Sequence, residues 1–252
     1  MTGHAVTYEP EWEYSPWPLV ISIGILFLAP FAFSLHFVYQ QSMLAVISLG
    51  MGVPLILIGI IGWISEAING GHGPPGLSIP AMGWFILAEA MIFVSFFVNY
   101  WFMRLSATSW PPDGTVELPT IAPLIMTIIL VSSSFTIHVS EAKLEQNDNS
   151  GFLKWLLLTI VLGICFLGFS AYEWNHLFHA GFDFTTNSYS TSFFTITGFH
   201  GAHVIIGISI FLAILFSALL GKFNLNLVKT GSLYWHFVDI IWFFVVSQLY
   251  YW

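Results

Sequence analysis

A glutamate inside a long apolar run is the residue of this sequence that most requires a chemical explanation. Glu89 lies in GWFILAEAMIFVSFFVNYWF, about 8 residues, or roughly 12 Å of helix, from the start of that run. A carboxylate is costly in hydrocarbon, so we expect the side chain to face protein, to hold its proton or to touch water. Two interpretations stay open: a group that handles protons, and a glutamate whose hydrogen bonds fix the packing of helices.

Two further groups of polar residues lie inside apolar runs. Thr197, His200 and His203 follow one another at intervals of three, so they line one helical face and could share a partner. Two histidines supply half of a metal site, but no further ligand follows at comparable spacing, so we expect hydrogen bonds and no metal. His236 and Asp239 lie one turn apart and form an expected structural pair, without the nucleophile that a Ser-His-Asp hydrolase needs.

Other residues of interest lie near the ends of apolar runs or stand alone. Glu173 closes the fifth run, and Glu66 and His72 follow the second. Interfacial water can solvate side chains at these depths. We therefore expect these three residues to be hydrated and to form no buried functional site. Cys165 is the single cysteine, which excludes an internal disulfide and a CxxC site, and we expect it to be a small buried hydrophobe.

Helices that cross a membrane must position these residues. The chain of 252 residues is 57% hydrophobic and 7% charged, whereas soluble domains carry about 25% charged residues. A bilayer core needs about 20 apolar residues per crossing. Seven apolar runs meet this length, at about 19–38, 43–65, 81–104, 121–141, 152–173, 192–220 and 233–252. We therefore predict an all-α integral membrane protein of seven transmembrane helices in a single membrane domain, residues 1–252.

The few charged residues predict an orientation and exclude one class of partner. With five Lys and Arg against thirteen acidic residues, the chain lacks the basic footprint of a nucleic-acid-binding protein. Lysines 143, 154, 222 and 229 fall on the side of the N-terminus and only Arg104 on the other, which predicts a cytoplasmic N-terminus and an outer C-terminus. The acidic N-terminal segment has no basic n-region, so we expect no cleavable signal peptide.

Several long motifs together resemble subunit III of the haem-copper cytochrome c oxidases. The strongest are SFFTITGFHGAHVIIGISIFL from Ser192 and YWHFVDIIWFFVV from Tyr234. Supporting motifs cover the rest of the chain: SPWP from Ser15, LAEAMIFVSFF around Glu89, WPPDG from Trp110, PLIMTIILVSSS from Pro123, and LTIVLG followed by Glu173 and Trp174.

The resemblance implies a fold and a set of partners. Two helices would be separated from a five-helix bundle by a cleft that holds phospholipids, and the chain would pack against subunit I, with subunit II in the same complex and cytochrome c as electron donor. Haem and copper would belong to the partner subunits and none to this chain. In that family the glutamate matched by Glu89 reacts with a carbodiimide and is linked to proton uptake, and the subunit supports oxygen access and protects the active centre.

This sequence departs from the family pattern at three places. Trp63 is followed by Ile64, Ser65 and Glu66 instead of Arg-Asp, so the basic contact to a lipid headgroup is missing, and Trp63, Glu66 and His72 remain candidates for lipid contact. Paired histidines at the end of the fourth helix are replaced by Glu141 and Ala142, and a glutamine of the fifth helix by Ser170. The roles of those family residues do not carry over.

Three alternatives stay open beside the cytochrome c oxidase. A subunit III of a quinol oxidase would show the same motifs, because donor chemistry belongs to other chains. A free-standing proton transporter could use Glu89, His236 and Asp239 as a relay, although few polar groups line the other runs. A membrane cytochrome b would need histidines on facing helices at matched depth, and His200 and His203 share one helix. The cytoplasmic membrane of a bacterium is favoured over a mitochondrial inner membrane.

Overall fold

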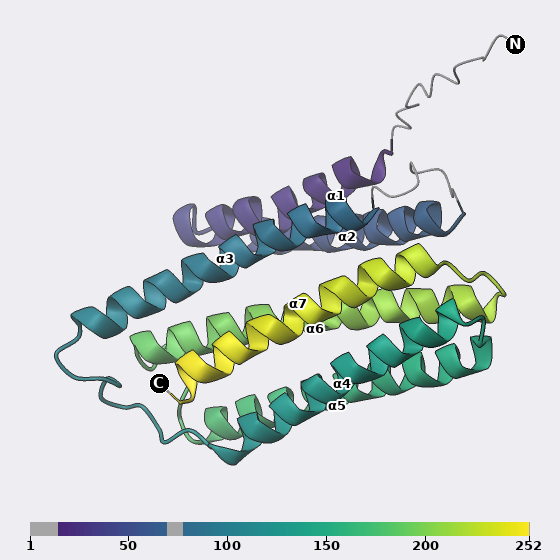
Figure 1. Cartoon of the computed structure of the whole chain (residues 1–252). Helices are drawn as coiled ribbons and strands as arrows, with labels where there is room; N and C mark the ends of the chain where they lie inside the picture. Colours follow the sequence, from purple (N-terminus) through teal and green to yellow (C-terminus); the bar gives the residue numbers. More distant parts are fainter. Residues whose placement is uncertain (1–14, 70–77, 252) are drawn as a thin grey trace, which may run out of the picture. The chain divides into compact units, whose positions relative to one another are not determined.

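The computed structural model describes residues 15–69 and 78–251, and all the regular structure in these two ranges is helical (Figure 1). Two compact units divide between Pro75 and Gly76. The first unit contains α1 (Trp17–Leu26), the π-helical segments η1 (Phe27–Phe31) and η2 (Ser34–Val38), and α2 (Ser42–Asn69). The second contains α3 (Ser78–Ser106), α4 (Ile121–Glu145), α5 (Asn149–His179), α6 (Ser188–Leu219) and α7 (Leu225–Leu249).

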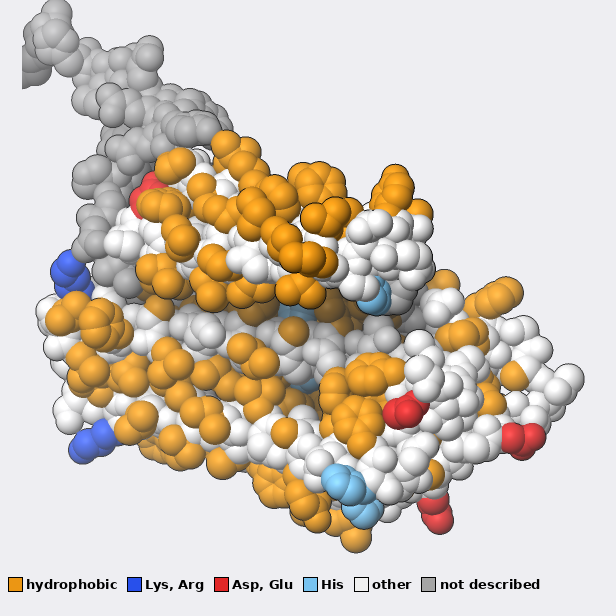
Figure 2. Space-filling model, turned by 180° about the vertical axis from the view of Figure 1, so that it is seen from behind, with side chains coloured by type: hydrophobic (Ala, Val, Ile, Leu, Met, Phe, Trp, Pro, Cys, Tyr) orange, Lys and Arg blue, Asp and Glu red, His pale blue; other side chains and the backbone are white. Residues whose placement is uncertain are grey.

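Six of the described helices, α2 to α7, are long and apolar enough to cross a membrane. Hydrophobic side chains cover most of the visible face of the helices (Figure 2). Many large apolar side chains are exposed, among them Trp84, Phe102 and Phe135, as expected where lipid replaces water as the solvent. The chain is thus a multi-pass membrane protein. The count of seven spans stays a prediction, because the first apolar run is an irregular helix.

That first run is helical from Trp17 to Val38, but it changes from α to π geometry twice. Pro30 lies inside η1 and has no N–H to donate, which disturbs the α-helical hydrogen bonds around it. Gln40 has φ 55° in the connection to α2. The first two apolar runs therefore form a kinked hairpin.

Small residues let α1 and α2 approach closely in the first unit. A Cβ atom at Gly52 would lie 2.7 Å from the backbone nitrogen of Leu28, and one at Gly24 would lie 2.9 Å from that of Ile56. Such distances leave no room for a side chain, so glycine is required at both positions.

In the second unit α7 packs against three helices, α3, α4 and α6. Within its most apolar stretch 61% of the residues are buried, more than in any other described helix of spanning length. The remaining contacts join α4 to α5, α5 to α6 and α3 to α6. Polar side chains on α7 therefore face several neighbours, whereas α3 and α5 each pack against two helices of this unit.

Polar caps at the connections set where the helices of the second unit begin. Asn187 forms a capping box with Ser190, and its side-chain nitrogen donates to the Thr115 hydroxyl at 2.9 Å. Asp148 caps α5 by accepting from the backbone N–H of Gly151 at 2.8 Å. That hydrogen bond, and then the ammonium of Lys143 at 3.3 Å, lower the pKa of the Asp148 carboxyl. These caps satisfy N–H groups that the first turn of a helix leaves without partners.

The helices extend beyond the apolar runs that predicted them. The expected last span begins at 233, but α7 begins at Leu225, after the cap residue Asn224. The expected fifth span ends at 173, whereas α5 continues to His179. Hydropathy detects only the part of a helix inside hydrocarbon, so polar terminal turns are missed. The expectation that Cys165 is buried was wrong: it is exposed on α5, because residues that face lipid are as apolar as buried ones.

Two predictions concern how the two units are placed relative to one another. They are the single membrane domain and the lipid-filled cleft between a two-helix group and a five-helix group. Both stay predictions.

Candidate functional site

Glu89 and His203 form an acid-base pair between α3 and α6. The Oε2 atom of Glu89 lies 3.1 Å from Nε2 of His203. Glu89 is the eleventh residue after the start of α3 at Ser78, which places it roughly 16 Å along the helix. The side chains are 20% and 6% exposed, respectively. The pair is thus well inside the apolar part of the helix and mostly shielded.

The second ring nitrogen of His203 determines how many protons this pair holds. Nδ1 lies 2.8 Å from the backbone oxygen of Phe199, and because a carbonyl only accepts, Nδ1 must carry a hydrogen. One proton is then shared between Nε2 and the Glu89 carboxyl. Whether it lies on nitrogen or oxygen, the pair as a whole is neutral, which permits burial without a net charge.

Aromatic rings enclose the imidazole of this pair. The centroids of Phe199 and Phe93 lie 4.6 and 5.1 Å from that of His203. Tyr234 of α7 stacks on the ring at 6.4 Å. These contacts exclude most lipid and water from the imidazole, and the Glu89 carboxyl is the more exposed partner of the pair.

His200 faces a different helix from His203. Its Nε2 atom donates to the backbone oxygen of Val238 on α7 at 3.2 Å, and its ring lies 5.0 Å from Trp242 and 5.6 Å from Phe166. Among the described residues the Nδ1 atom has no partner, although it is buried. The two histidines therefore point to α7 and to α3, and they do not share a partner.

His236 and Asp239 are joined through a third side chain, Ser134 of α4. The Ser134 hydroxyl lies 3.0 Å from Nδ1 of His236 and donates to Oδ2 of Asp239. On the other side of the ring, the hydroxyl of Ser232 lies 3.4 Å from Nε2. The second oxygen of Asp239, Oδ1, is buried without a partner in the described ranges. This group ties α4 to α7.

Glu173 is buried, which corrects the expectation that interfacial water solvates it. Its side chain packs inside the second unit, where the residue is 5% exposed, and Oε2 accepts from the Tyr250 hydroxyl at 2.9 Å. The expectation was wrong because α5 continues for six residues beyond Glu173 and ends only at His179.

The polar residues identified in the sequence thus lie in separate groups: Glu89 is paired with His203, His200 is bonded to a backbone oxygen, Ser134 bridges His236 and Asp239, and Glu173 is paired with Tyr250. Sequence reasoning missed Ser134 and Tyr250. Three successive serines inside an apolar run could have indicated Ser134, because hydroxyl groups in membrane helices commonly form hydrogen bonds with neighbouring helices.

Nothing in the described ranges brings three or more His, Cys, Asp or Glu side chains together as a metal site. Both ring nitrogens of His203 and one of His200 are already occupied by hydrogen bonds. Only Nδ1 of His200 could serve as a ligand without breaking one of these bonds.

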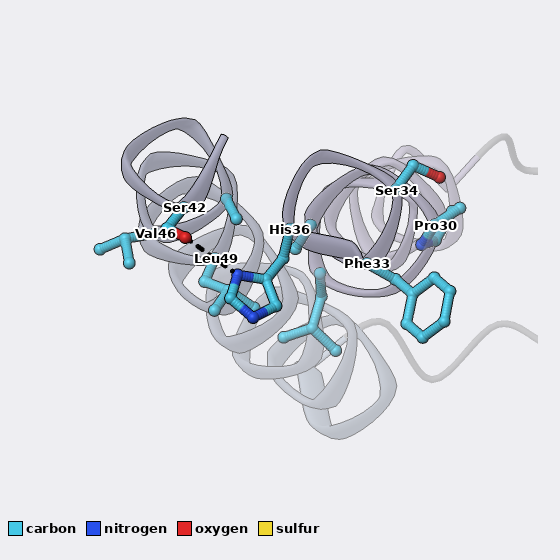
Figure 3. A pocket seen from close by; sticks show the side chains of 10 residues that line it. Pro30, Phe33, Ser34, His36, Ser42, Val46 and Leu49 are labelled. Carbon is cyan, nitrogen blue, oxygen red and sulfur yellow. Dashed lines mark hydrogen bonds between the residues drawn. The ribbon is translucent and has the colours of Figure 1, made fainter. Parts of the chain in front are cut away.

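The first unit carries an apolar groove of about 950 Å³ beside its π-helical segments. In Figure 3 the ring of His36 lies between the two helical stretches, and its Nδ1 atom is 3.2 Å from the Ser42 hydroxyl. Pro30, Phe33 and Leu49 are among the apolar residues of the lining. The groove therefore fits hydrocarbon, with polar side chains at Ser34, His36 and Ser42.

The residues proposed for lipid contact lie elsewhere on this unit. Trp63 is 50% exposed, and the Glu66 carboxylate accepts from the Ser15 hydroxyl at 2.7 Å. His72 lies outside the described residues. A lipid at this end of α2 would meet an exposed indole and a carboxylate.

Helices of this length and apolarity, with buried acid-base groups paired across them, define a multi-pass helical membrane protein. The sequence model of the family described as "Cytochrome c oxidase subunit III" matches residues 11–252. The chain therefore belongs to the cytochrome c oxidase subunit III family.

Individual relatives support the same assignment. The chain is 38% identical over 186 residues to cytochrome c oxidase subunit 3 of Synechocystis sp., covering 72% of this chain and 78% of the relative. It is 34% identical over 259 residues to the subunit 3 of Formosania lacustris, covering 94% of each. With the subunit 3 of Drosophila melanogaster it shares 32% identity over 257 residues, covering 95% of each.

Proposed function

We propose that this chain is the accessory subunit III of a proton-pumping haem-copper cytochrome c oxidase, without redox centres of its own. It packs mainly against subunit I, in a complex with subunit II, and cytochrome c delivers the electrons. The family match over residues 11–252 supports the assignment to this complex. Haem and copper belong to the partner subunits, in keeping with His200 and His203, which use three of their four ring nitrogens in hydrogen bonds.

The pair of Glu89 and His203 carries the proposed role in proton uptake. It holds one shared proton, is neutral, and is more exposed at the carboxyl than at the imidazole. A second proton can enter at Glu89 and leave there again, because the ring is enclosed by aromatic side chains. Such a pair can hold a proton near the entrance to a partner's proton pathway without carrying electrons.

Lipid binding and oxygen access are the other proposed roles. The apolar groove of the first unit supports the first, since its volume of about 950 Å³ accommodates hydrocarbon chains. The exposed Trp63 supports a headgroup-level contact near the end of α2, where amphipathic rings commonly lie. Bound lipid would in turn keep an apolar path for oxygen, which dissolves in hydrocarbon.

The proposed location is the cytoplasmic membrane of a bacterium, with the N-terminus in the cytoplasm and the C-terminus outside. The excess of lysines on the N-terminal side supports this orientation. Glu89 then lies on the half of α3 nearer to the cytoplasm, the side from which an oxidase takes up its protons.

The decisive experiment is purification from native membranes through a tag on this chain. We expect co-purifying subunits I and II, identified by mass spectrometry, together with a haem spectrum that belongs to them. The chain expressed alone should bind no haem or copper. Recovery of the chain without partners, from membranes that contain an assembled oxidase, would contradict the proposal and favour the free-standing transporter. Quinol in place of cytochrome c as the donor of the purified complex would favour the quinol oxidase.

A further inference from the structure

A second groove, in the second unit, lies beside Glu173 and has no place in the proposed function. Its volume is about 250 Å³, and it is lined by residues of α5, α6 and α7 with one residue of α4. Met126, Trp242 and Glu173 form buried parts of the lining, and Ala171, Ala202 and Ile205 are exposed. The groove is therefore open between α5 and α6 toward the molecular surface.

Small residues on α6 create this space. An added Cβ at Gly201 would meet no described heavy atom within 4 Å, whereas one at Gly198 would lie 2.9 Å from Cη2 of Trp174. Gly201 thus leaves a true gap that a larger side chain could fill, and Gly198 lets α6 and the indole pack closely. Close packing therefore occurs at Gly198 and is absent at Gly201.

Three polar groups of the lining form hydrogen bonds, whereas one buried oxygen does not. Thr197 donates to the backbone oxygen of Phe193 at 2.7 Å, and Trp242 donates to the Thr127 hydroxyl at 3.0 Å. Tyr250 donates to Oε2 of Glu173 at 2.9 Å. Across the described residues the other oxygen of this carboxyl, Oε1, is buried and has no partner. A buried polar atom without a hydrogen bond is costly, so a missing partner is indicated.

We infer that this groove binds a neutral membrane lipid with a free hydroxyl in its head, which forms a hydrogen bond with Glu173. A hydroxyl can donate a hydrogen bond to Oε1, which a methyl ether cannot do. A phosphate headgroup would place negative charge beside the acid, which is unfavourable in a medium of low polarity. Glu173 lies six residues before the end of α5 at His179, roughly 9 Å along the helix, a depth that a head near the interface reaches.

The size of the groove limits the ligand to a head and part of one chain. Its 250 Å³ is a little below the range of about 300–1,000 Å³ that holds a whole drug-sized molecule. The apolar, exposed rim at Ala202 and Ile205 leads outward from Glu173. The remainder of the hydrocarbon chain would therefore lie on the lipid-facing surface of α5 and α6.

The probe for this inference is a long-chain alcohol that carries a photoreactive diazirine in its chain, applied to native membranes or to the purified complex. Its methyl ether, which keeps the chain but lacks the hydroxyl hydrogen, serves as comparator. Labelled peptides are mapped by mass spectrometry. We expect labelling of the α5 and α6 segments that line the groove, and about 2- to 10-fold less labelling with the ether, as the loss of one hydrogen bond implies.

Two pairs of variants separate the groove from the general lipid surface. Gly201→Leu fills the gap, whereas Gly168→Leu adds the same side chain at an exposed position of α5 that also has no described neighbour within 4 Å. We expect labelling to be lost in the first and kept in the second. Glu173→Gln keeps a hydrogen-bonding side chain and should retain labelling, whereas Glu173→Leu should reduce it to the level of the ether.

Three results would overturn the inference: equal labelling by alcohol and ether, labelling that Gly201→Leu leaves unchanged, and crosslinking of the groove residues to a partner chain in the intact complex. The last result would show that a protein segment covers the groove. If Glu173→Leu fails to assemble, the comparison of alcohol with ether and of Gly201→Leu with Gly168→Leu still decides, because neither alters Glu173.

Discussion

The carboxyl of Glu89 and the imidazole of His203 meet at 3.1 Å although 114 residues separate them in the chain. The carbonyl of Phe199 holds the other ring nitrogen at 2.8 Å, so the ring cannot turn away from Glu89 without losing a hydrogen bond. The helices α3 and α6 are thereby linked by an acid-base pair.

Replacement of Glu89 tests whether this group handles protons. Glu89→Gln keeps a hydrogen bond to His203 but cannot take up a proton, so we expect normal assembly and haem spectra, loss of carbodiimide labelling and slower proton uptake. Stopped-flow measurement with a pH indicator checks the last point. Glu89→Ala should in addition cost about 1–3 kcal/mol of stability, because Nε2 of His203 is left buried without a partner. Disappearance of the whole complex in both variants would make Glu89 a structural residue.

Removal of the subunit from the assembled oxidase should leave the initial rate of oxygen reduction largely intact and shorten the lifetime of the enzyme under turnover. Electrons pass through the partner subunits, so their route survives. Proton delivery slows without Glu89, and reduced intermediates then wait longer at the metal centre. Oxygen consumption over many turnovers, at several pH values and with or without the subunit, checks this. An unchanged lifetime at every pH would refute the protective role.

Ser134 is expected to matter more for stability than its neighbour Ser132. Ser134→Ala removes the hydroxyl that bridges His236 and Asp239, which should cost about 1–3 kcal/mol because a buried carboxyl loses its partner. Ser132 is exposed and bonds only to the Ile128 carbonyl of its own helix in the described structure, so Ser132→Ala should change stability by at most about 0.5 kcal/mol. Thermal unfolding of the detergent-solubilised complex compares the two.

Gly207 is expected to tolerate no side chain. A Cβ atom there would lie 2.6 Å from Cε3 of the buried Trp235, and we expect Gly207→Ala to destabilise the chain by about 1–3 kcal/mol through overpacking. Gly168→Ala on the exposed side of α5 should be neutral or stabilising by up to about 1 kcal/mol. Equal unfolding temperatures for these two variants would contradict the tight packing of α6 on α7.

The cap of α5 predicts a dependence of stability on pH. The pKa of Asp148 is lowered by the Gly151 N–H and by Lys143, so its stabilising effect is complete above the unfolded pKa of about 3.9 and is lost as the pH falls through the lower folded value. Asp148→Ala should therefore lower the unfolding temperature at pH 7, and the difference should shrink at pH values below about 4. A difference that stays constant down to the lowest pH would exclude the carboxylate as its source.

The sequence predicted the apolar helices well and their partners poorly. Runs of apolar residues identify α2 to α7 because hydrocarbon selects them directly, yet the same runs placed Glu173 at a helix end and Cys165 in the core. Hydropathy does not distinguish a neighbour helix from lipid. Glu89 was identifiable as a residue that needs a partner, but which of several distant histidines supplies it depends on the rotation of α6 against α3, and no local pattern encodes that rotation.

The π-helical segments of the first unit have a consequence for how the length of the chain can change. A π turn closes its hydrogen bonds between residues five apart instead of four, so η1 and η2 each hold one residue more than an α turn. Deletion of one residue between Phe27 and Val38 can restore α geometry there, while the residues on either side keep their neighbours. In the helices of the second unit the same deletion would rotate every later side chain by about 100°. Insertions and deletions that a lineage accumulates in its membrane helices are therefore expected to gather in this stretch.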